Sequence, residues 1–209
     1  GARVALWVVT QLQWFPMDMK PAVPVPGAMA RPYPDFWNYT LRDYGNRVGV
    51  YRIFKVLDKL GLKSSVAINS ALAERHPFLI EQVNQRGWEV VANGLDMGHI
   101  IHGEMDREEE AAMIKGVLDS LRKLSGQPVR GWLSPIRSES FNTPDIAAAN
   151  GIEYLCDWLN DDMPYAFETK SGTIHNLPHT MELDDQQVLV TLRHTEQEYV
   201  DQLKDQFDC

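Results

Sequence analysis

Side chains that bind metals or transfer protons follow the apolar run 88–92. They are Asn93, His99, His102 and Glu104. Imidazole and carboxylate groups are ligands that zinc prefers in proteins. Glycines interrupt the segment, so we predict a loop rather than a helix on which residues three apart would share a face. A solvated surface loop is therefore the favoured interpretation, with a metal site or substrate contacts as alternatives.

Mostly polar residues stand at the ends of five apolar runs along the chain. In a parallel sheet the carboxyl ends of the strands meet at one edge, where active sites form. We therefore predict that these residues gather at one edge and line a site. They are Thr10, Gln11, Gln13, Asn69, Asn93, Leu133, Ser134, Pro135, Asp157 and Trp158.

The elements that must position these residues alternate between strands and helices. Apolar runs predict strands at 3–9, 63–69, 88–93, 129–135 and 152–158, with a strand and loop at 172–185. Helical spacing predicts helices at 48–61, 70–87, 105–126, 143–151 and 195–208, whereas 186–192 fits a strand or a helix. Prolines predict a long loop at 15–36. This order predicts an α/β fold with a mostly parallel sheet.

Glycine, proline and capping residues help to locate the predicted helix boundaries. Gly61 and Gly126 are expected to end two helices, and Pro77 is expected to break a third. Thr143 is the expected N-cap of another helix, with Pro144 at its first position.

Composition places the chain among acidic globular proteins. Its 209 residues favour a single domain, 1–209, and 44% hydrophobic residues allow a sizeable core. The formal charge of −9 and the lack of a basic run argue against nucleic acid as a partner. No apolar run reaches the ~18 residues of a membrane helix, so we expect no membrane partner and a cytoplasmic protein. We predict that Cys156 is a buried thiol and that the chain is truncated at both ends.

Several stretches resemble the polysaccharide deacetylase superfamily (carbohydrate esterase family 4), closest to its metal-independent allantoinase-like and cyclic-imide hydrolase branch. They are YGNRVGVYRIFKVLDKLGLKSSVAIN, LSGQPVRGWLSP, GIEYLCDWLNDDMPY and LPHTMELDD. The resemblance covers most of residues 3–205. It implies a distorted (β/α)₇ barrel whose last strand and helix lie beyond this chain, and hydrolysis of carbon–nitrogen bonds in amides or N-acetyl sugars.

The resemblance also bears on metal binding. Metal-dependent members carry an Asp pair after the first strand and His-x-x-x-His after the third. Here Gln11 and Gln13 stand near the acidic positions, and Asn93 and Met97 stand at the histidine positions. Amides and a thioether are poor ligands for Zn²⁺. We therefore expect no cofactor, with zinc or another divalent metal as the alternative.

Amide hydrolysis needs a base, donors for the oxyanion and an acid for the leaving nitrogen. Asp157 is the best candidate base, followed by Asp161 and Asp162, which could instead cap a turn. His179 is a candidate general acid or an ordinary loop histidine.

The remaining candidates would bind substrate. Trp132, Ser134 and Pro135 resemble the substrate-groove motif of the family, although Trp132 could equally be core. Arg47 could clamp a carbonyl or carboxylate, or pair with an acid such as Asp43. Further candidates are Gln13, Trp14, Asn93 and Trp158. Aromatic residues of the proline-rich segment, namely Phe15, Tyr33, Phe36, Trp37 and Tyr39, could wall the substrate or pack against another subunit, and we expect a homo-oligomer.

Three functions remain open. The favoured one is a metal-independent hydrolase of a small amide, ureide or cyclic imide. The second is a metal-dependent deacetylase of an amino sugar or polysaccharide, with a site built on His99, His102 and Glu104. The third is a non-catalytic relative that binds a ligand.

Overall fold

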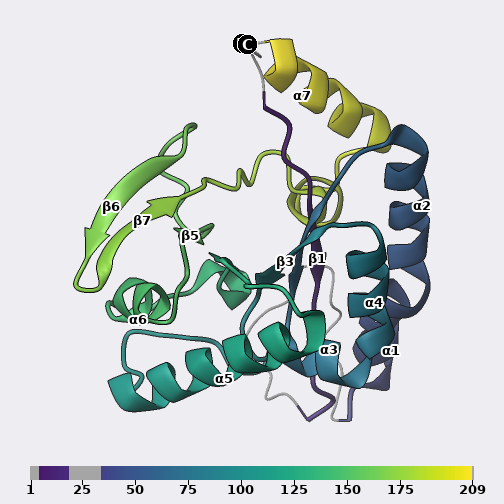
Figure 1. The fold of residues 1–209 in the computed structure, drawn as a ribbon. Coiled ribbons are helices and arrows are strands. Elements are labelled where there is room, and N and C mark those ends of the chain that lie inside the picture. Colours follow the sequence, from purple (N-terminus) through teal and green to yellow (C-terminus); the bar gives the residue numbers. More distant parts are fainter. Residues whose placement is uncertain (1–4, 19–33, 209) are drawn as a thin grey trace.

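A computed structural model describes residues 5–18 and 34–208 of the chain. The described residues form a mixed α/β fold around one mostly parallel sheet (Figure 1). Its strands are β1 Val9–Leu12, β2 Ser65–Ile68, β3 Glu89–Ala92, β4 Gly131–Trp132, β5 Tyr154–Leu155, β6 Tyr165–Thr169 and β7 Gly172–Asn176.

The order of the strands in space follows their order in the sequence as far as β5. The sheet runs β1-β2-β3-β4-β5-β7-β6, with every neighbouring pair parallel except the β6–β7 hairpin. Within the described residues β1 and β6 lie at opposite edges, so the sheet stays open. This architecture is consistent with the predicted distorted barrel, although the barrel is not closed.

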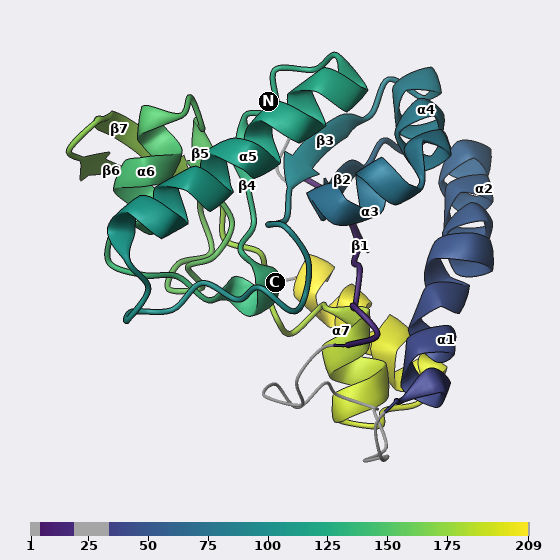
Figure 2. The same ribbon diagram turned by 90° about the horizontal axis from the view of Figure 1, so that it is seen from below.

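Helices alternate with the strands, and most of them pack against the sheet, whereas the last helix buries no residue. They are α1 Phe36–Tyr44, α2 Val50–Leu60, α3 Ser70–Arg75, α4 Pro77–Gln85, α5 Arg107–Ser125, α6 Thr143–Ala149 and α7 Glu196–Asp208. Shorter helical turns are η1 Gly45–Gly49, η2 Pro135–Arg137 and η3 Gln186–Thr191. Figure 2 shows α2, α3, α4 and α5 side by side around the strands. None of the described helices is long and apolar enough to cross a membrane.

The main core fills the space between the sheet and these helices. Val66 and Ile68 of β2 pack there with Phe54 of α2 and Leu118 of α5. Because side chains alternate along a strand, the intervening residue Ala67 faces the other side. There it joins a second, smaller cluster with Val91, Leu133 and Cys156, and the cysteine is buried as predicted.

The predicted helices at 48–61, 70–87 and 105–126 are confirmed. Gly61 and Gly126 end two of them in the left-handed conformation, as their lack of a Cβ allows. The predicted break before Pro77 separates α3 from α4. The N-cap prediction for the later helix was wrong: Asn142 is the cap and Thr143 already lies in α6.

Three other predictions need correction. The first strand is Val9–Leu12 rather than 3–9, because those residues pair in parallel with Ser65–Ile68; residues 3 and 4 lie outside the described part. Within 15–36, Asp35 is the N-cap and Phe36 the first residue of α1, and Trp37 and Tyr39 lie further along the same helix. Residues 19–33, with Tyr33, lie outside the described residues. The sequence predicted the second strand of the β6–β7 hairpin but missed the first, β6, whose side chains alternate between half-buried and exposed positions.

Candidate functional site

A layer of buried polar side chains lies at the carboxyl ends of the strands, as predicted. Asn69, Asn93, Ser134, Asp157 and Asn176 follow or end β2, β3, β4, β5 and β7, and all five are buried. Hydrogen bonds join neighbouring strand ends. The Asn69 amide donates to the Asn93 carbonyl oxygen, and Asn93 Nδ2 donates to the Leu133 carbonyl at 2.7 Å. These bonds hold the strand ends in one rigid edge.

Asp157 is the buried carboxylic acid of this layer. Its Oδ1 accepts the Ser134 backbone N–H at 2.7 Å, and its side chain lies beside the carboxyl group of Glu139. Burial first, and the facing Glu139 second, raise the pKa of Asp157 well above its usual range, against the opposing Ser134 hydrogen bond. Asp157 Oδ2 and Glu139 Oε1 are both buried without a donor among the described residues. A proton shared between the two groups satisfies both oxygens.

Glu139 connects this carboxyl pair to an open cavity. Its other oxygen, Oε2, accepts the indole N–H of Trp158 at 2.9 Å. Glu139 and Trp158 line a cavity of about 430 Å³, together with Phe141 and Phe167. Trp158 is 37% exposed and stacks on Phe167 with ring centroids 4.8 Å apart. The cavity therefore offers aromatic surface for a flat molecule next to an acid–base pair.

The turn that follows β4 is strained. Ile136 and Arg137 have φ of 51° and 56°, a region that a β-branched residue such as isoleucine rarely adopts. Its neighbour Pro135 is buried against Gly94, where an added Cβ would lie 2.4 Å from the proline ring. Strain of this kind persists only where the surroundings impose it, and it gathers at functional sites. The turn directs Arg137 and Glu139 toward two different partners.

Arg137 reaches His179. Arg137 Nη2 lies 2.7 Å from His179 Nδ1. The same arginine atom, Nη2, lies 3.9 Å from Asp184 Oδ2. An arginine only donates, so His179 Nδ1 accepts and the ring proton sits on Nε2. Burial, and then the Arg137 charge, lower the pKa of His179. The histidine is thus a neutral hydrogen-bond donor through Nε2. The general-acid role predicted for it needs the protonated ring, which burial and Arg137 disfavour.

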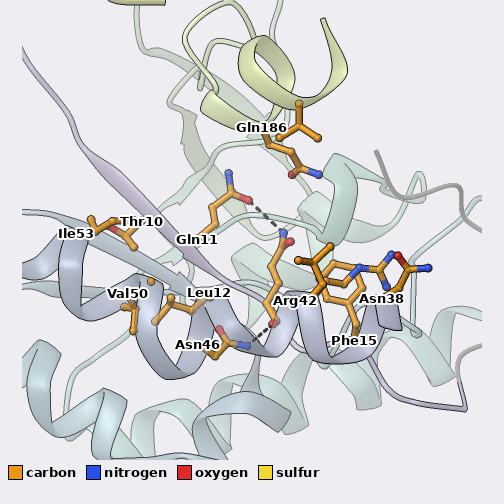
Figure 3. Close-up of a pocket in the computed structure, with 15 residues that line it drawn as sticks. Thr10, Gln11, Leu12, Phe15, Asn38, Arg42, Asn46, Val50, Ile53 and Gln186 are labelled. Atoms are coloured by element: carbon orange, nitrogen blue, oxygen red, sulfur yellow. Dashed lines mark hydrogen bonds between the residues drawn. The ribbon is translucent and has the colours of Figure 1, made fainter. Parts of the chain in front are cut away.

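A second cavity, of about 370 Å³, lies along the edge strand β1 (Figure 3). Gln11 and Gln13 face it, joined by a hydrogen bond of 3.2 Å between their amides. Asn46, in η1, donates to the Gln13 carbonyl at 3.0 Å, and Gln186 of η3 closes the far wall. Arg42 supplies a guanidinium group whose pKa is lowered by burial. Gln13 therefore lies in an amide-rich pocket, as a substrate contact requires.

Other predicted substrate contacts are packed into the protein. Trp132 is fully buried in the main core, with its N–H on Ser134 Oγ at 2.8 Å, so it supports the strand end rather than touching substrate. Trp14 is buried with the Arg75 guanidinium over its ring. Arg47 is exposed and pairs with Asp43 at 2.5 Å, which is the structural alternative.

The weak metal candidates are not gathered into a ligand set. His99, His102 and Glu104 are exposed, and His99 Nδ1 binds Asp96 at 2.7 Å within the loop. The described residues contain no group of three or more His, Cys, Asp or Glu side chains that could hold a metal. At the family's histidine position, the Asn93 side chain bridges two strand ends: its Oδ1 accepts from Asn69 Nδ2 at 3.4 Å and its Nδ2 donates to the Leu133 carbonyl. Asn93 therefore does not supply the imidazole that zinc prefers at this position.

The other predicted acids lie at the surface. Asp161 and Asp162 are exposed in the segment before β6, and Asp161 Oδ1 accepts the Met163 N–H at 3.0 Å. This bond is the turn cap that was the alternative interpretation. Among the described residues, Asp162 lacks a partner comparable to the Glu139 carboxyl group that lies beside Asp157.

Sequence reasoning missed Glu139, Arg137 and Glu110. All three lie outside the strand ends, on the turn after β4 or on α5, and so outside the rule that located the site. The only available signal was the density of polar residues in IRSESFNT, directly after the predicted strand.

The fold and this strand-end site define an α/β protein whose mostly parallel sheet carries a buried polar layer at its strand ends. The polysaccharide deacetylase family model matches residues 39–155, more than half of the chain. The chain therefore belongs to the polysaccharide deacetylase family. No curated protein matches its sequence.

Solved structures of similar fold agree with this assignment. The chain is similar to PuuE allantoinase, with a TM-score of 0.74 and 26% identity, over 82% of this chain and 57% of that one. It is also similar in fold to a probable polysaccharide deacetylase from Pseudomonas aeruginosa PAO1, with a TM-score of 0.75 and 24% identity, over 95% of this chain and 64% of that one. The chain thus spans less than two thirds of the length of either relative.

Proposed function

We propose that the chain belongs to an enzyme that hydrolyses a carbon–nitrogen bond in a small amide, ureide or cyclic imide without a metal ion. Membership of the polysaccharide deacetylase family and the 26% identity to an allantoinase support this reaction class. The observation that carries the proposal is the buried Asp157 carboxyl group beside the half-buried Glu139, which lines an aromatic cavity. A homo-oligomer in the cytoplasm is part of the same proposal.

In this mechanism the carboxyl pair moves protons. Water attacks the substrate carbonyl carbon while Glu139, which lines the cavity, takes the water proton. Asp157 lies behind Glu139, and a proton shared between the two carboxyl groups lets the pair accept and release a proton during the reaction. The proton then passes to the leaving nitrogen as the carbon–nitrogen bond breaks, giving a carboxylic acid and an amine or amide.

Two further groups complete the arrangement. We assign to the neutral His179, whose ring Arg137 holds, the donation of its Nε2–H to the developing oxyanion; His179 is not among the residues that line the Glu139 cavity, so this role requires the substrate to extend beyond that cavity. Trp158 and Phe167 provide a flat apolar wall that suits a planar imide or ureide.

The test uses the full-length protein that contains this chain. Cyclic imides, ureides and N-acetyl amino sugars are offered with and without a chelator. We expect hydrolysis of an imide or ureide that survives chelation, and a loss of about 100-fold or more in Asp157→Asn and Glu139→Gln. Glu153→Gln is the matched control, because this nearby glutamate is exposed and pairs only with Arg130 at 3.2 Å.

Three outcomes contradict the proposal. Activity that disappears on chelation and returns with zinc establishes a metal-dependent enzyme. Ligand binding without turnover of any compound establishes a non-catalytic relative. Full activity in both carboxyl variants removes the carboxyl pair from the reaction.

A further inference from the structure

Glu110 is a fully buried carboxylate that the proposed reaction does not use. It lies on α5, within the first turns of that helix, and has no exposed surface. Both of its oxygens accept hydrogen bonds from one short segment. Oε2 accepts the Ser140 hydroxyl at 2.6 Å, and Oε1 accepts the Thr143 hydroxyl at 2.5 Å.

The segment that Glu110 holds is the turn between η2 and α6. Within this turn the Ser140 N–H donates to Thr143 Oγ1 at 2.9 Å, and the Asn142 N–H donates to Ser140 Oγ at 2.9 Å. The two hydroxyls that bind Glu110 therefore also organise the backbone of the turn. Glu110 thus fastens a four-residue turn to a long, well-packed helix.

The turn has little apolar packing of its own. Phe141, its large apolar side chain, is 99% exposed. On the other side of Glu139, Ser138 Oγ donates to the Ile101 carbonyl at 2.5 Å. Polar contacts, rather than core packing, thus fix the backbone on both sides of Glu139.

We propose that Glu110 is a positioning residue that sets Glu139 against Asp157. Ser140 is the next residue after Glu139, so the Glu110–Ser140 bond limits where the Glu139 side chain can reach. Loss of this bond allows the turn to move away from β5 and separates the two carboxyl groups. The inference rests on the proposed function for its catalytic meaning, but the pairing itself is measurable without turnover.

The experiment follows the titration of Asp157 by NMR in full-length protein labelled with ¹³C at its carboxyl groups. Wild type, Glu110→Ala, Glu110→Gln and the control Glu109→Ala are compared; Glu109 is an exposed neighbour on the same helix. We expect the apparent pKa of Asp157 to fall by about one unit or more in Glu110→Ala, because Glu139 no longer faces it. Glu110→Gln, which keeps one acceptor, shifts it less, and Glu109→Ala leaves it unchanged.

A second pair of variants covers the case in which Glu110→Ala does not fold. Thr143→Val and Ser140→Ala each remove one hydroxyl from the turn, and each is expected to shift the Asp157 titration in the same direction. A titration equal to wild type in every folded variant overturns the inference.

Turnover separates this inference from the proposed function. In an active enzyme, Glu110→Gln moves the pH profile of kcat while leaving KM nearly unchanged. A shifted Asp157 titration in a protein that hydrolyses nothing keeps the positioning role and removes the proposed reaction. Hydrolysis of substrate by variants whose Asp157 titration is unshifted removes the positioning role of Glu110 and keeps the proposed reaction.

Discussion

Replacing Asp157 by asparagine tests whether the folded protein keeps a proton on this carboxyl group. Asparagine has almost the same shape, its Oδ1 can accept the Ser134 N–H that now lies at 2.7 Å, and its amide can donate to Glu139. The substitution therefore preserves the hydrogen bonds of the protonated acid. It removes only the ability to titrate.

The sign and size of the effect follow from proton linkage. Burial and then Glu139 raise the pKa of Asp157 in the folded chain, whereas the unfolded chain releases this proton at about pH 4. Between the two pKa values the folded chain holds one more proton, so wild-type stability falls as the pH rises. The slope is about 1.4 kcal/mol per pH unit for one proton. Asp157→Asn lacks this loss and becomes progressively more stable than wild type across that window.

The assay is urea unfolding of wild type and Asp157→Asn at pH values from about 4 to 8. Asp162→Asn, which removes a surface charge, is the control. We expect the stability difference between Asp157→Asn and wild type to grow with pH, while hydrolysis is lost. A difference that stays constant over this range would refute the reasoning, because it means that Asp157 ionises in the folded chain as it does in the unfolded one.

Three further predictions concern the same edge of the sheet. Burial and Arg137 lower the pKa of His179 in the folded chain, so the unfolded chain binds a proton at a higher pH than the folded chain does. The free energy of unfolding of wild type therefore falls as the pH drops below about 6.5. Urea unfolding at pH 7 and pH 5 should show a smaller fall in His179→Gln. Gly131→Ala places a Cβ 2.3 Å from the Tyr154 ring and lowers the free energy of unfolding by about 2–3 kcal/mol. In a protein that already carries Tyr154→Leu, Gly131→Ala lowers the free energy of unfolding by less. Ile136→Gly relieves a φ of 51° at a side chain that is 51% exposed, so thermal unfolding should show it about 1 kcal/mol more stable than Ile136→Ala.

The sequence located the buried acid of the site because its signal is local. Asp157 ends an apolar run, and alternation of strands and helices places the ends of such runs at one edge of a sheet. The strand-end amides Asn69 and Asn93 followed from the same rule, and both lie in the buried polar layer. Gln13 likewise lines a cavity at this edge.

The partners of these residues had no local signal. Glu139 meets Asp157 through the path of the turn after β4, and Arg137 meets His179 across two connections that no periodicity describes. For Trp132 the sequence could not choose between two roles, because a tryptophan at a strand end fits the wall of a substrate groove and the core equally well; the structure buries it in the core. Burial decides between these roles, and burial depends on every element packed against the strand.

The sequence by itself determined the α/β alternation, the helix boundaries marked by Gly61, Gly126 and Pro77, and the edge of the sheet on which chemistry would lie. These features depend on hydrophobic periodicity and on backbone preferences that act within a few residues. Only the tertiary structure decided that Asp157 faces Glu139 and that Glu110 holds the turn between them. Contacts of that kind join distant segments, and their energies depend on how completely the fold removes water from the groups involved.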